Sequence, residues 1–128
     1  MESTGLRDAA IHTSLPASDL DRAKRFFEDK LGLTPKSEST STAFYEVRDG
    51  RFEVFVTGGA PSGSHTQMEW LVDDIERTVS QLRERGVVFD EYDTPDFKTV
   101  GGIATFGTSK VAWFKDSEGN VHSIAQLG

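Results

Sequence analysis

The chain has 128 residues, no cysteine and a formal net charge of −7 at pH 7. This length fits one domain, expected to cover residues 1–128, and the lack of cysteine excludes disulfides and thiolate zinc sites. The acidic balance argues against general nucleic-acid binding, and no apolar run approaches the ~20 residues of a membrane helix. The first residues also lack the apolar core of a signal peptide. We therefore expect a cytoplasmic protein that binds neither nucleic acid nor membranes.

The first predicted element is an apolar strand over residues 9–15, which Pro16 ends. Ser18 or Asp19 then caps a helix, because short polar side chains accept hydrogen bonds from the free amides of the first turn. One face of this helix is apolar at helical spacing: Leu20, Ala23, Phe26, Phe27 and Leu31. Gly32 ends the helix.

A hairpin is predicted next, after a short extended piece over residues 33–37. Strands at 42–48 and 51–57 flank Asp49-Gly50, which favours a two-residue type I′ turn. Alternation gives the hairpin one apolar face and one mixed face. The apolar face holds Ala43, Tyr45, Val47, Phe52, Val54 and Val56, and the mixed face holds Phe44, Glu46, Arg48, Arg51, Glu53 and Phe55.

The second half follows a linker over residues 58–65 that is rich in glycine and serine. It starts with a strand over 66–72, a helix over 74–85 and a strand over 87–92. The next segment, 93–109, is long and mixes glycines with Phe97, Ile103 and Phe106, which predicts a loop folded over something. The last two strands are predicted at 110–114 and 121–127.

The two halves repeat one another. The sequence Asp-Leu-Asp-Arg at residues 19–22 returns as Asp-Ile-Glu-Arg at residues 74–77, and each copy follows a strand-like stretch and opens a helix. Such a repeat indicates two copies of one unit, about 8–58 and 66–127, with a cleft where they meet.

Four segments carry a family resemblance: HTSLPASDL from His12, FF at residues 26–27 followed by LGL at 31–33, VDDI from Val72, and FKDSEGN from Phe114. They resemble motifs of the vicinal oxygen chelate superfamily, which includes glyoxalase I, extradiol dioxygenases and fosfomycin- and bleomycin-resistance proteins. The resemblance implies an α+β fold of two βαβββ modules, which form an open curved sheet around a cleft with the helices on the outer face. It also implies a homodimer.

Metal-using members of this superfamily hold an ion with four side chains. The resemblance places these positions at His12, Glu53, Gln67 and Ser123. Serine and glutamine are weak ligands, so the set has two good donors where catalytic sites usually have three. We therefore expect no metal cofactor; the alternative is one divalent ion held by His12, Glu53 and Gln67.

Two points stay open at this stage. In the predicted hairpin Glu46 faces Glu53. Glu46 could then supply the ligand site with a second carboxylate, or the pair could form a cation-receptive patch or include a carboxyl of raised pKa. The alternative is that the neighbouring Arg48 and Arg51 neutralise the pair. The resemblance puts Ser123 in the cleft, whereas counting from Gly50 and Gly119 makes His122 the equivalent of Glu53. His122 otherwise packs near the helices or at the surface, and His65, in the linker, is expected to be exposed.

The leading hypothesis is a metal-independent protein of the bleomycin-resistance type that sequesters a small molecule. Aromatic platforms beside carboxylates favour a cationic, partly planar ligand. The predicted ligand-binding residues are His12, Phe44, Glu46, Glu53, Phe55, Gln67, Glu69, Trp113 and Ser123, with Phe97 and Phe106 as further platforms. The alternative is a metal-dependent lyase, isomerase or dioxygenase in which Glu53 or Glu69 moves a proton. A third possibility is an interaction domain without a ligand.

Overall fold

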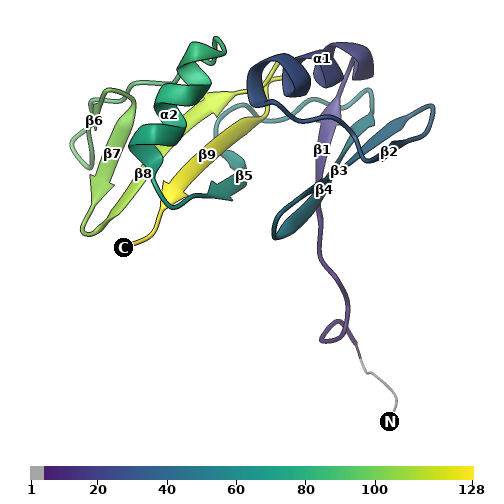
Figure 1. The fold of residues 1–128 in the computed structure, drawn as a ribbon, viewed down its shortest axis with the longest axis horizontal. Helices are drawn as coiled ribbons and strands as arrows, with labels where there is room; N and C mark the ends of the chain where they lie inside the picture. Colours follow the sequence, from purple (N-terminus) through teal and green to yellow (C-terminus); the bar gives the residue numbers. More distant parts are fainter. Residues whose placement is uncertain (1–4) are drawn as a thin grey trace.

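The computed structural model describes residues 5–128, which form two sheets that each carry one helix (Figure 1). The elements of the first half are β1 (Thr13–Ala17), α1 (Leu20–Leu31), β2 (Ser37–Glu38), β3 (Thr42–Val47) and β4 (Gly50–Val56). They make a four-stranded sheet of order β1-β4-β3-β2, in which β1 runs parallel to β4 and the other pairs are antiparallel.

The second half repeats this plan. Its elements are β5 (Thr66–Leu71), α2 (Ile75–Glu84), β6 (Thr99–Val100), β7 (Ile103–Phe106), β8 (Ser109–Lys115) and β9 (Val121–Gln126). The sheet order is β5-β9-β8-β7-β6, with β5 parallel to β9. The predicted α+β fold of two βαβββ modules is confirmed, with β6 as one additional short strand. No helix within residues 5–128 is long and apolar enough to cross a membrane.

Both helices begin where their capping residues predict, and α1 also ends at its predicted glycine. The Asp19 and Asp74 side chains accept hydrogen bonds from the amides of Arg22 (3.0 Å) and Arg77 (3.1 Å), as N-cap residues do. At the other end of α1, Gly32 has a φ of 71°, a left-handed conformation that glycine adopts without the steric strain of a side chain.

Each helix packs on one face of its own sheet, and Figure 1 shows both helices on the same side of the molecule. The first core has Phe27 of α1 against Tyr45 and Phe52, and the second has Val79 of α2 in one cluster with Phe114. Phe26, Leu31 and Trp70 pack against both cores and so join the halves. The opposite face of each sheet, turned away from its helix, is called the open face below.

Some strand boundaries differ from the prediction. Pro16 lies inside β1 and does not end it, which is possible because β1 is an edge strand and needs no amide donor on its outer side. The predicted strand at 87–92 contributes only an isolated bridge between Phe89 and Phe114. The segment 93–109, predicted as a loop, contains β6 and β7.

The predicted register of the first hairpin was wrong. Arg48 and Asp49 form the turn, Val47 pairs with Gly50, and no residue other than glycine among residues 5–128 has a positive φ, which a type I′ turn requires. Glu46 therefore lies opposite Arg51, and the predicted glutamate pair does not form. The pairing is displaced by two residues, so each side chain keeps its predicted face.

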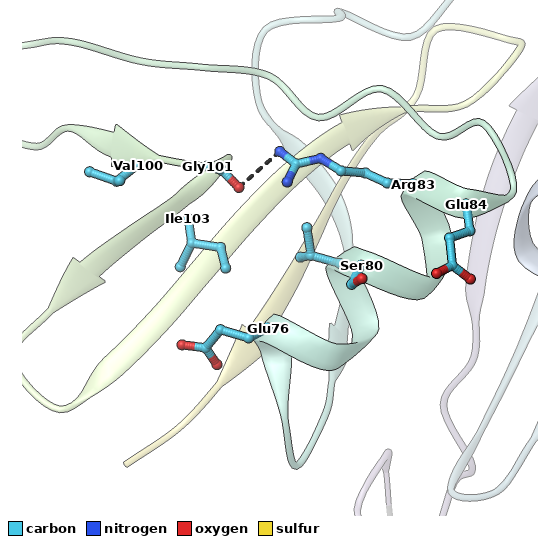
Figure 2. Close-up of a pocket in the computed structure, with 8 residues that line it drawn as sticks. Glu76, Ser80, Arg83, Glu84, Val100, Gly101 and Ile103 are labelled. Carbon is cyan, nitrogen blue, oxygen red and sulfur yellow. Dashed lines mark hydrogen bonds between the residues drawn. The ribbon is translucent and has the colours of Figure 1, made fainter.

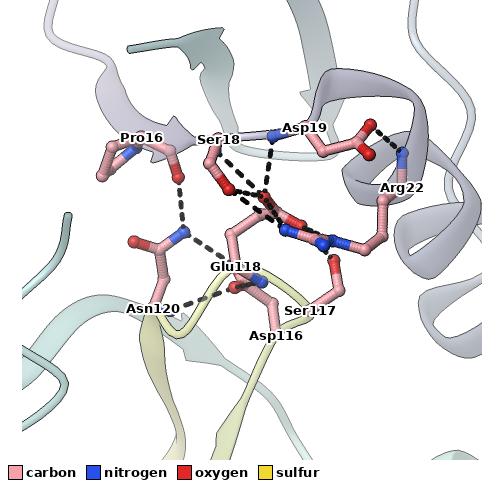
Figure 3. Close-up of polar contacts among 8 residues, drawn as sticks. All are labelled: Pro16, Ser18, Asp19, Arg22, Asp116, Ser117, Glu118 and Asn120. Carbon is pink, nitrogen blue, oxygen red and sulfur yellow. Dashed lines mark hydrogen bonds and ion pairs between the residues drawn. The ribbon is translucent and has the colours of Figure 1, made fainter. Parts of the chain in front are cut away.

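The turn between β8 and β9 fastens the second half to the start of α1 (Figure 3). Glu118 accepts hydrogen bonds from the amides of Ser18 (3.0 Å) and Asp19 (3.1 Å), and its other oxygen pairs with Arg22 Nε at 2.8 Å. Burial alone would raise the pKa of Glu118, but hydrogen bonds from Arg22, Ser117 and the Asp19 amide lower it to about 2. The carboxylate therefore completes the N-terminal cap of α1 from a segment far away in the sequence.

Candidate functional site

The open face of the first sheet places His12, Ser14 and Glu53 together. Parallel pairing puts Ser14 beside Glu53, and the Ser14 hydroxyl donates a hydrogen bond of 2.7 Å to Glu53 Oε1. The same oxygen lies 3.4 Å from His12 Nε2. Two of the predicted metal-ligand positions are thus neighbours.

The open face of the second sheet repeats this contact with the residue types exchanged. β5 supplies Glu69, and β9 supplies Ser123, whose hydroxyl donates to Glu69 Oε2 at 2.7 Å. Each half therefore has one serine-glutamate pair across its parallel strands. Gln67 lies two residues before Glu69 along β5, and its side-chain oxygen is buried without a hydrogen-bond partner.

The register of the last strand is settled by the length of the preceding turn. Residues 116–120 separate the paired Lys115 and Val121, whereas only Arg48 and Asp49 separate the strands of the first hairpin. Counting from the turn glycines therefore aligns the halves wrongly by one residue. Ser123 is on the open face, as the resemblance implied, and His122 is not.

His122 is a fully buried core residue. Trp70 Nε1 donates to its Nδ1 at 3.1 Å, and because an indole N–H is only a donor, Nδ1 carries no proton. His122 Nε2 then carries the hydrogen and donates to Asp116 Oδ2 at 2.9 Å. The ring also stacks on Phe114, with centroids 4.8 Å apart. Both ring nitrogens are satisfied, so His122 braces the β8–β9 turn and has no free donor for a ligand or a metal.

The four predicted ligand positions do not form one metal site within the chain. His12 and Glu53 belong to the first sheet, Gln67 and Ser123 to the second, and no hydrogen bond or ion pair in the part described by the structure joins the two groups. Across residues 5–128, no cluster of three His, Asp or Glu side chains is arranged to hold an ion. The Ser123 hydroxyl, moreover, donates its hydrogen to Glu69.

Glu46 supplies no second carboxylate to this group. It pairs with Lys36 Nζ at 2.6 Å, and that hydrogen bond, together with the Lys36 charge, lowers the pKa of Glu46. The expected carboxyl of raised pKa is therefore not found at Glu46. The two aromatic residues of this hairpin that are predicted to contact a ligand are Phe44 and Phe55. Phe44, on β3, is 38% exposed and lies opposite Glu53, and Phe55, on β4, lies opposite Thr42.

A pocket of about 470 Å³ lies on the open face of the second sheet and is called the aromatic pocket below. Its walls come from β8, β9, the start of β5, the linker between the halves and the segment after α2: Gly63, Ser64, His65, Thr66, Tyr92, Phe97, Trp113, Lys115 and Val121. Trp113 lies 5.4 Å between centroids from both Tyr92 and Phe97, and Phe106 extends the cluster from Phe97 at the same distance. The long segment at 93–109 thus folds over Trp113.

The sequence predicts Trp113, Phe97 and Phe106 as aromatic residues that contact a ligand, but it does not predict two further residues that line this pocket, Tyr92 and Lys115. Tyr92 lies after the isolated bridge between Phe89 and Phe114, and its ring packs edge-on against Trp113. Lys115 follows from alternation along β8, two residues after Trp113. His65 is exposed, as expected, and also lines the pocket.

Other hollows lie elsewhere on the molecule. A groove of about 490 Å³ lies between α2 and the β6–β7 hairpin (Figure 2). In it, Arg83 Nη2 donates a hydrogen bond of 2.8 Å to the Gly101 carbonyl. Glu76, on the rim of this groove, is already paired with Lys110 at 2.6 Å. A larger hollow of about 690 Å³ lies between the β3–β4 turn and residues 69–73. In the other half, the equivalent contact is the one that Glu118 makes between the β8–β9 turn and the start of α1. Neither hollow joins several aromatic rings, so the aromatic pocket is the better candidate for ligand recognition.

Comparison with known proteins places this geometry in a family. Residues 10–124 match the family model described as "Glyoxalase/Bleomycin resistance protein/Dioxygenase superfamily". No curated protein sequence matches the chain.

Solved structures agree with this match in fold. UcmS2 is 20% identical, with a TM-score of 0.70, over 89% of this chain and 94% of its own. A bleomycin-binding protein complexed with bleomycin is 18% identical, with a TM-score of 0.70, over 93% of this chain and 98% of its own. Lactoylglutathione lyase from Agrobacterium tumefaciens is 16% identical, with a TM-score of 0.65, over 93% of each chain. At these identities the likeness shows the fold, and with the family match it establishes that the chain belongs to the glyoxalase/bleomycin resistance protein/dioxygenase superfamily.

Proposed function

We propose that this protein binds a small molecule with a planar ring in the aromatic pocket and needs no resident metal to do so. The observation that carries the proposal is the cluster of Trp113, Tyr92 and Phe97 around a cavity of about 470 Å³. This volume lies within the range of small-molecule sites, and rings at such angles leave faces and edges for a stacked ligand. Stacking contributes about 0.5–1.5 kcal/mol for each aromatic contact beyond the burial of apolar area.

The family supports ligand binding without deciding between a binder and an enzyme. One structure of this fold is a bleomycin-binding protein with bleomycin, and another is named as a lactoylglutathione lyase. A fold alone does not fix an activity. The donor set in this chain favours the binder, because only His12 and Glu53 come together and three protein ligands are usual at a catalytic metal.

The second candidate is a metal-dependent lyase, isomerase or dioxygenase. It is favoured by the 3.4 Å separation of His12 Nε2 and Glu53 Oε1. Gln67 lies on the other sheet, so this candidate requires a homodimer that brings the first open face of one copy to the second open face of another. We expect such a homodimer on either hypothesis, since exposed apolar side chains such as Phe44 and Leu71 lie on these two faces. A cytoplasmic location remains the expectation.

Calorimetric titration with bicyclic aromatic probes tests the binder. We expect at least one anionic, neutral or cationic naphthalene derivative to bind with a Kd below 1 mM, and Trp113→Ala to weaken it at least tenfold. Val100→Ala, at an exposed apolar position in the separate groove beside α2, is the control and should leave the Kd unchanged. Absence of binding by every probe, or equal Kd values for the wild type and Trp113→Ala, would overturn the proposal.

Elemental analysis of protein purified without chelator separates the binder from the enzyme. We expect less than 0.1 equivalent of nickel, zinc, manganese or iron, both as purified and after incubation with each ion and gel filtration. One equivalent of metal that His12→Ala removes would establish the second candidate instead.

A further inference from the structure

The charges around the aromatic pocket define its ligand more closely than the aromatic rings do. No aspartate or glutamate is among the nine residues that line the pocket, and Lys115 is the one lining residue with a permanent charge. His65, also in the wall, has its Nδ1 within 2.6 Å of the Ser62 hydroxyl. The pocket wall is therefore cationic, although the whole chain is acidic.

Lys115 is free to contact a ligand. Within residues 5–128 it makes no ion pair, whereas Lys24, Lys36 and Lys110 each bind a glutamate at 2.6 to 2.8 Å. Lys115 lies two residues after Trp113 on β8, on the same face of the sheet. Two residues of a strand span about 7 Å, so the ammonium group can meet a charge at the edge of a ring that stacks near Trp113.

The acidic groups nearby are not placed to cancel this charge within the pocket. Four acidic residues adjoin lining residues in the sequence, and Asp90 is two residues from Tyr92, but none of the five lines the pocket: Glu91, Asp93, Asp96, Asp116 and Asp90. Asp116 is bonded to His122 and Asn120, and Asp90 Oδ2 is buried. Burial, and then the Asp90 charge, raise the pKa of Tyr92, so its phenol stays protonated at neutral pH and can donate a hydrogen bond. The remaining negative charge is distributed over the surface, where salt screens it beyond about 8 Å.

The carboxylates expected to attract a cation lie outside the pocket wall and have hydrogen-bond partners of their own. Glu53 and Glu69 accept from the hydroxyls of Ser14 and Ser123, and Glu46 is paired with Lys36. None of these three glutamates lines the aromatic pocket. The expected cationic ligand therefore has no partner in this pocket.

We propose that the aromatic pocket selects a planar aromatic ligand that carries an anionic group, such as a carboxylate, which Lys115 binds while the ring stacks against Trp113 and Phe97. This inference rests on the proposed function and adds the charge of the ligand. A charge-assisted hydrogen bond from the ammonium group to a carboxylate is stronger than a neutral one. Recognition of a neutral isostere should consequently be weaker.

Three probes of one shape test the inference: 2-naphthoate, 2-naphthamide and 2-naphthylmethylammonium. We expect the wild-type protein to bind naphthoate about tenfold more tightly than naphthamide and to bind the ammonium probe most weakly. Lys115→Gln should remove the preference for naphthoate and leave the Kd of naphthamide unchanged. Lys36→Gln, which changes the net charge equally outside the pocket, is the matched control and should keep the preference.

The outcomes separate the two proposals. If naphthamide or the ammonium probe binds as tightly as naphthoate, or if Lys115→Gln keeps the preference, the inferred charge is wrong while the binding function stands. If none of the three probes binds, the proposed function fails, and the inference fails with it.

Discussion

Replacing Glu118 with glutamine should destabilise the protein by about 3 kcal/mol at pH 7. The side chain is 1% exposed and accepts hydrogen bonds from the amides of Ser18 and Asp19 and from Arg22, which explains why its pKa falls from the ordinary 4.5 to about 2. At about 1.4 kcal/mol per pH unit, this difference corresponds to roughly 3 kcal/mol of folding free energy. The substituted amide would keep the shape of the side chain but lose the charge that Arg22 and the start of α1 stabilise.

The stability that Glu118 contributes should decrease as the pH falls. A carboxyl whose pKa is lower in the folded state contributes its full stability above its unfolded pKa of 4.5 and loses it as the pH falls to about 2. Urea unfolding followed by tryptophan fluorescence at pH 7 and at pH 2.5 should therefore show the wild type and Glu118→Gln converging at the lower pH.

Asp49→Asn is the matched control for this experiment. Asp49 is the turn carboxylate in the other half, is 80% exposed and pairs only with its neighbour Arg48, so its loss should change stability by less than about 0.5 kcal/mol. Equal stabilities of the wild type and Glu118→Gln at pH 7, or a difference that does not shrink at pH 2.5, would refute the reasoning.

Three further predictions concern the core, the end of α1 and the assembly. His122→Ala should lower the free energy of unfolding in urea by about 3 to 5 kcal/mol, because it leaves a cavity and removes the hydrogen-bond partner of Trp70 and Asp116. His65→Ala, at an exposed site, is the control and should change the free energy little. Equal losses in the two variants would contradict the core role of His122. Gly32→Ala should cost about 1 kcal/mol because its φ of 71° is strained for alanine, and an unchanged thermal midpoint would contradict this. Light scattering should give twice the 14.1 kDa mass of one chain, and the mass of a single chain at micromolar concentration would rule out the homodimer.

The two halves share a framework but use it differently. Ser14 with Glu53, and Ser123 with Glu69, form the same hydrogen bond at 2.7 Å, with the serine on the edge strand in one half and on the central strand in the other. One junction between the halves is closed by Glu118, and the equivalent junction is open. The aromatic pocket occurs in the second half, where the segment 93–109 covers the sheet. The two halves thus share a backbone plan but differ in their side chains.

Much of the fold could be predicted from the sequence because local signals agreed with one another. Asp19 and Asp74 mark helix starts, Gly32 marks a helix end, and alternation in the first hairpin assigns Tyr45 and Phe52 to the core face. The hairpin register could not be predicted, because the preference of Asp49-Gly50 for a type I′ turn was overridden and the turn moved to Arg48-Asp49. That displacement also removed the expected pair of facing glutamates.

The site was less predictable because it depends on long-range packing. Trp113 and Phe97 could be recognised as candidate platforms, but their meeting depends on how residues 93–109 cross the sheet. The sequence predicted Glu46, Glu53 and Glu69 beside the aromatic rings. In the structure these glutamates bind Lys36 or serine hydroxyls and do not line the pocket, whereas Lys115 does. A loop conformation of this kind is set by contacts that no short motif encodes.

The most direct test of ligand binding at the aromatic pocket is a nuclear magnetic resonance titration of nitrogen-15-labelled protein with 2-naphthoate. The chain has two tryptophans, of which Trp113 lines the pocket and Trp70 lies in the core beside His122. We expect the Trp113 indole signal and the amides of its neighbours to shift in a saturable manner while the Trp70 indole signal stays in place. Saturable shifts at Trp70 or around His12 and Glu53, with Trp113 unmoved, would contradict the assignment of this pocket.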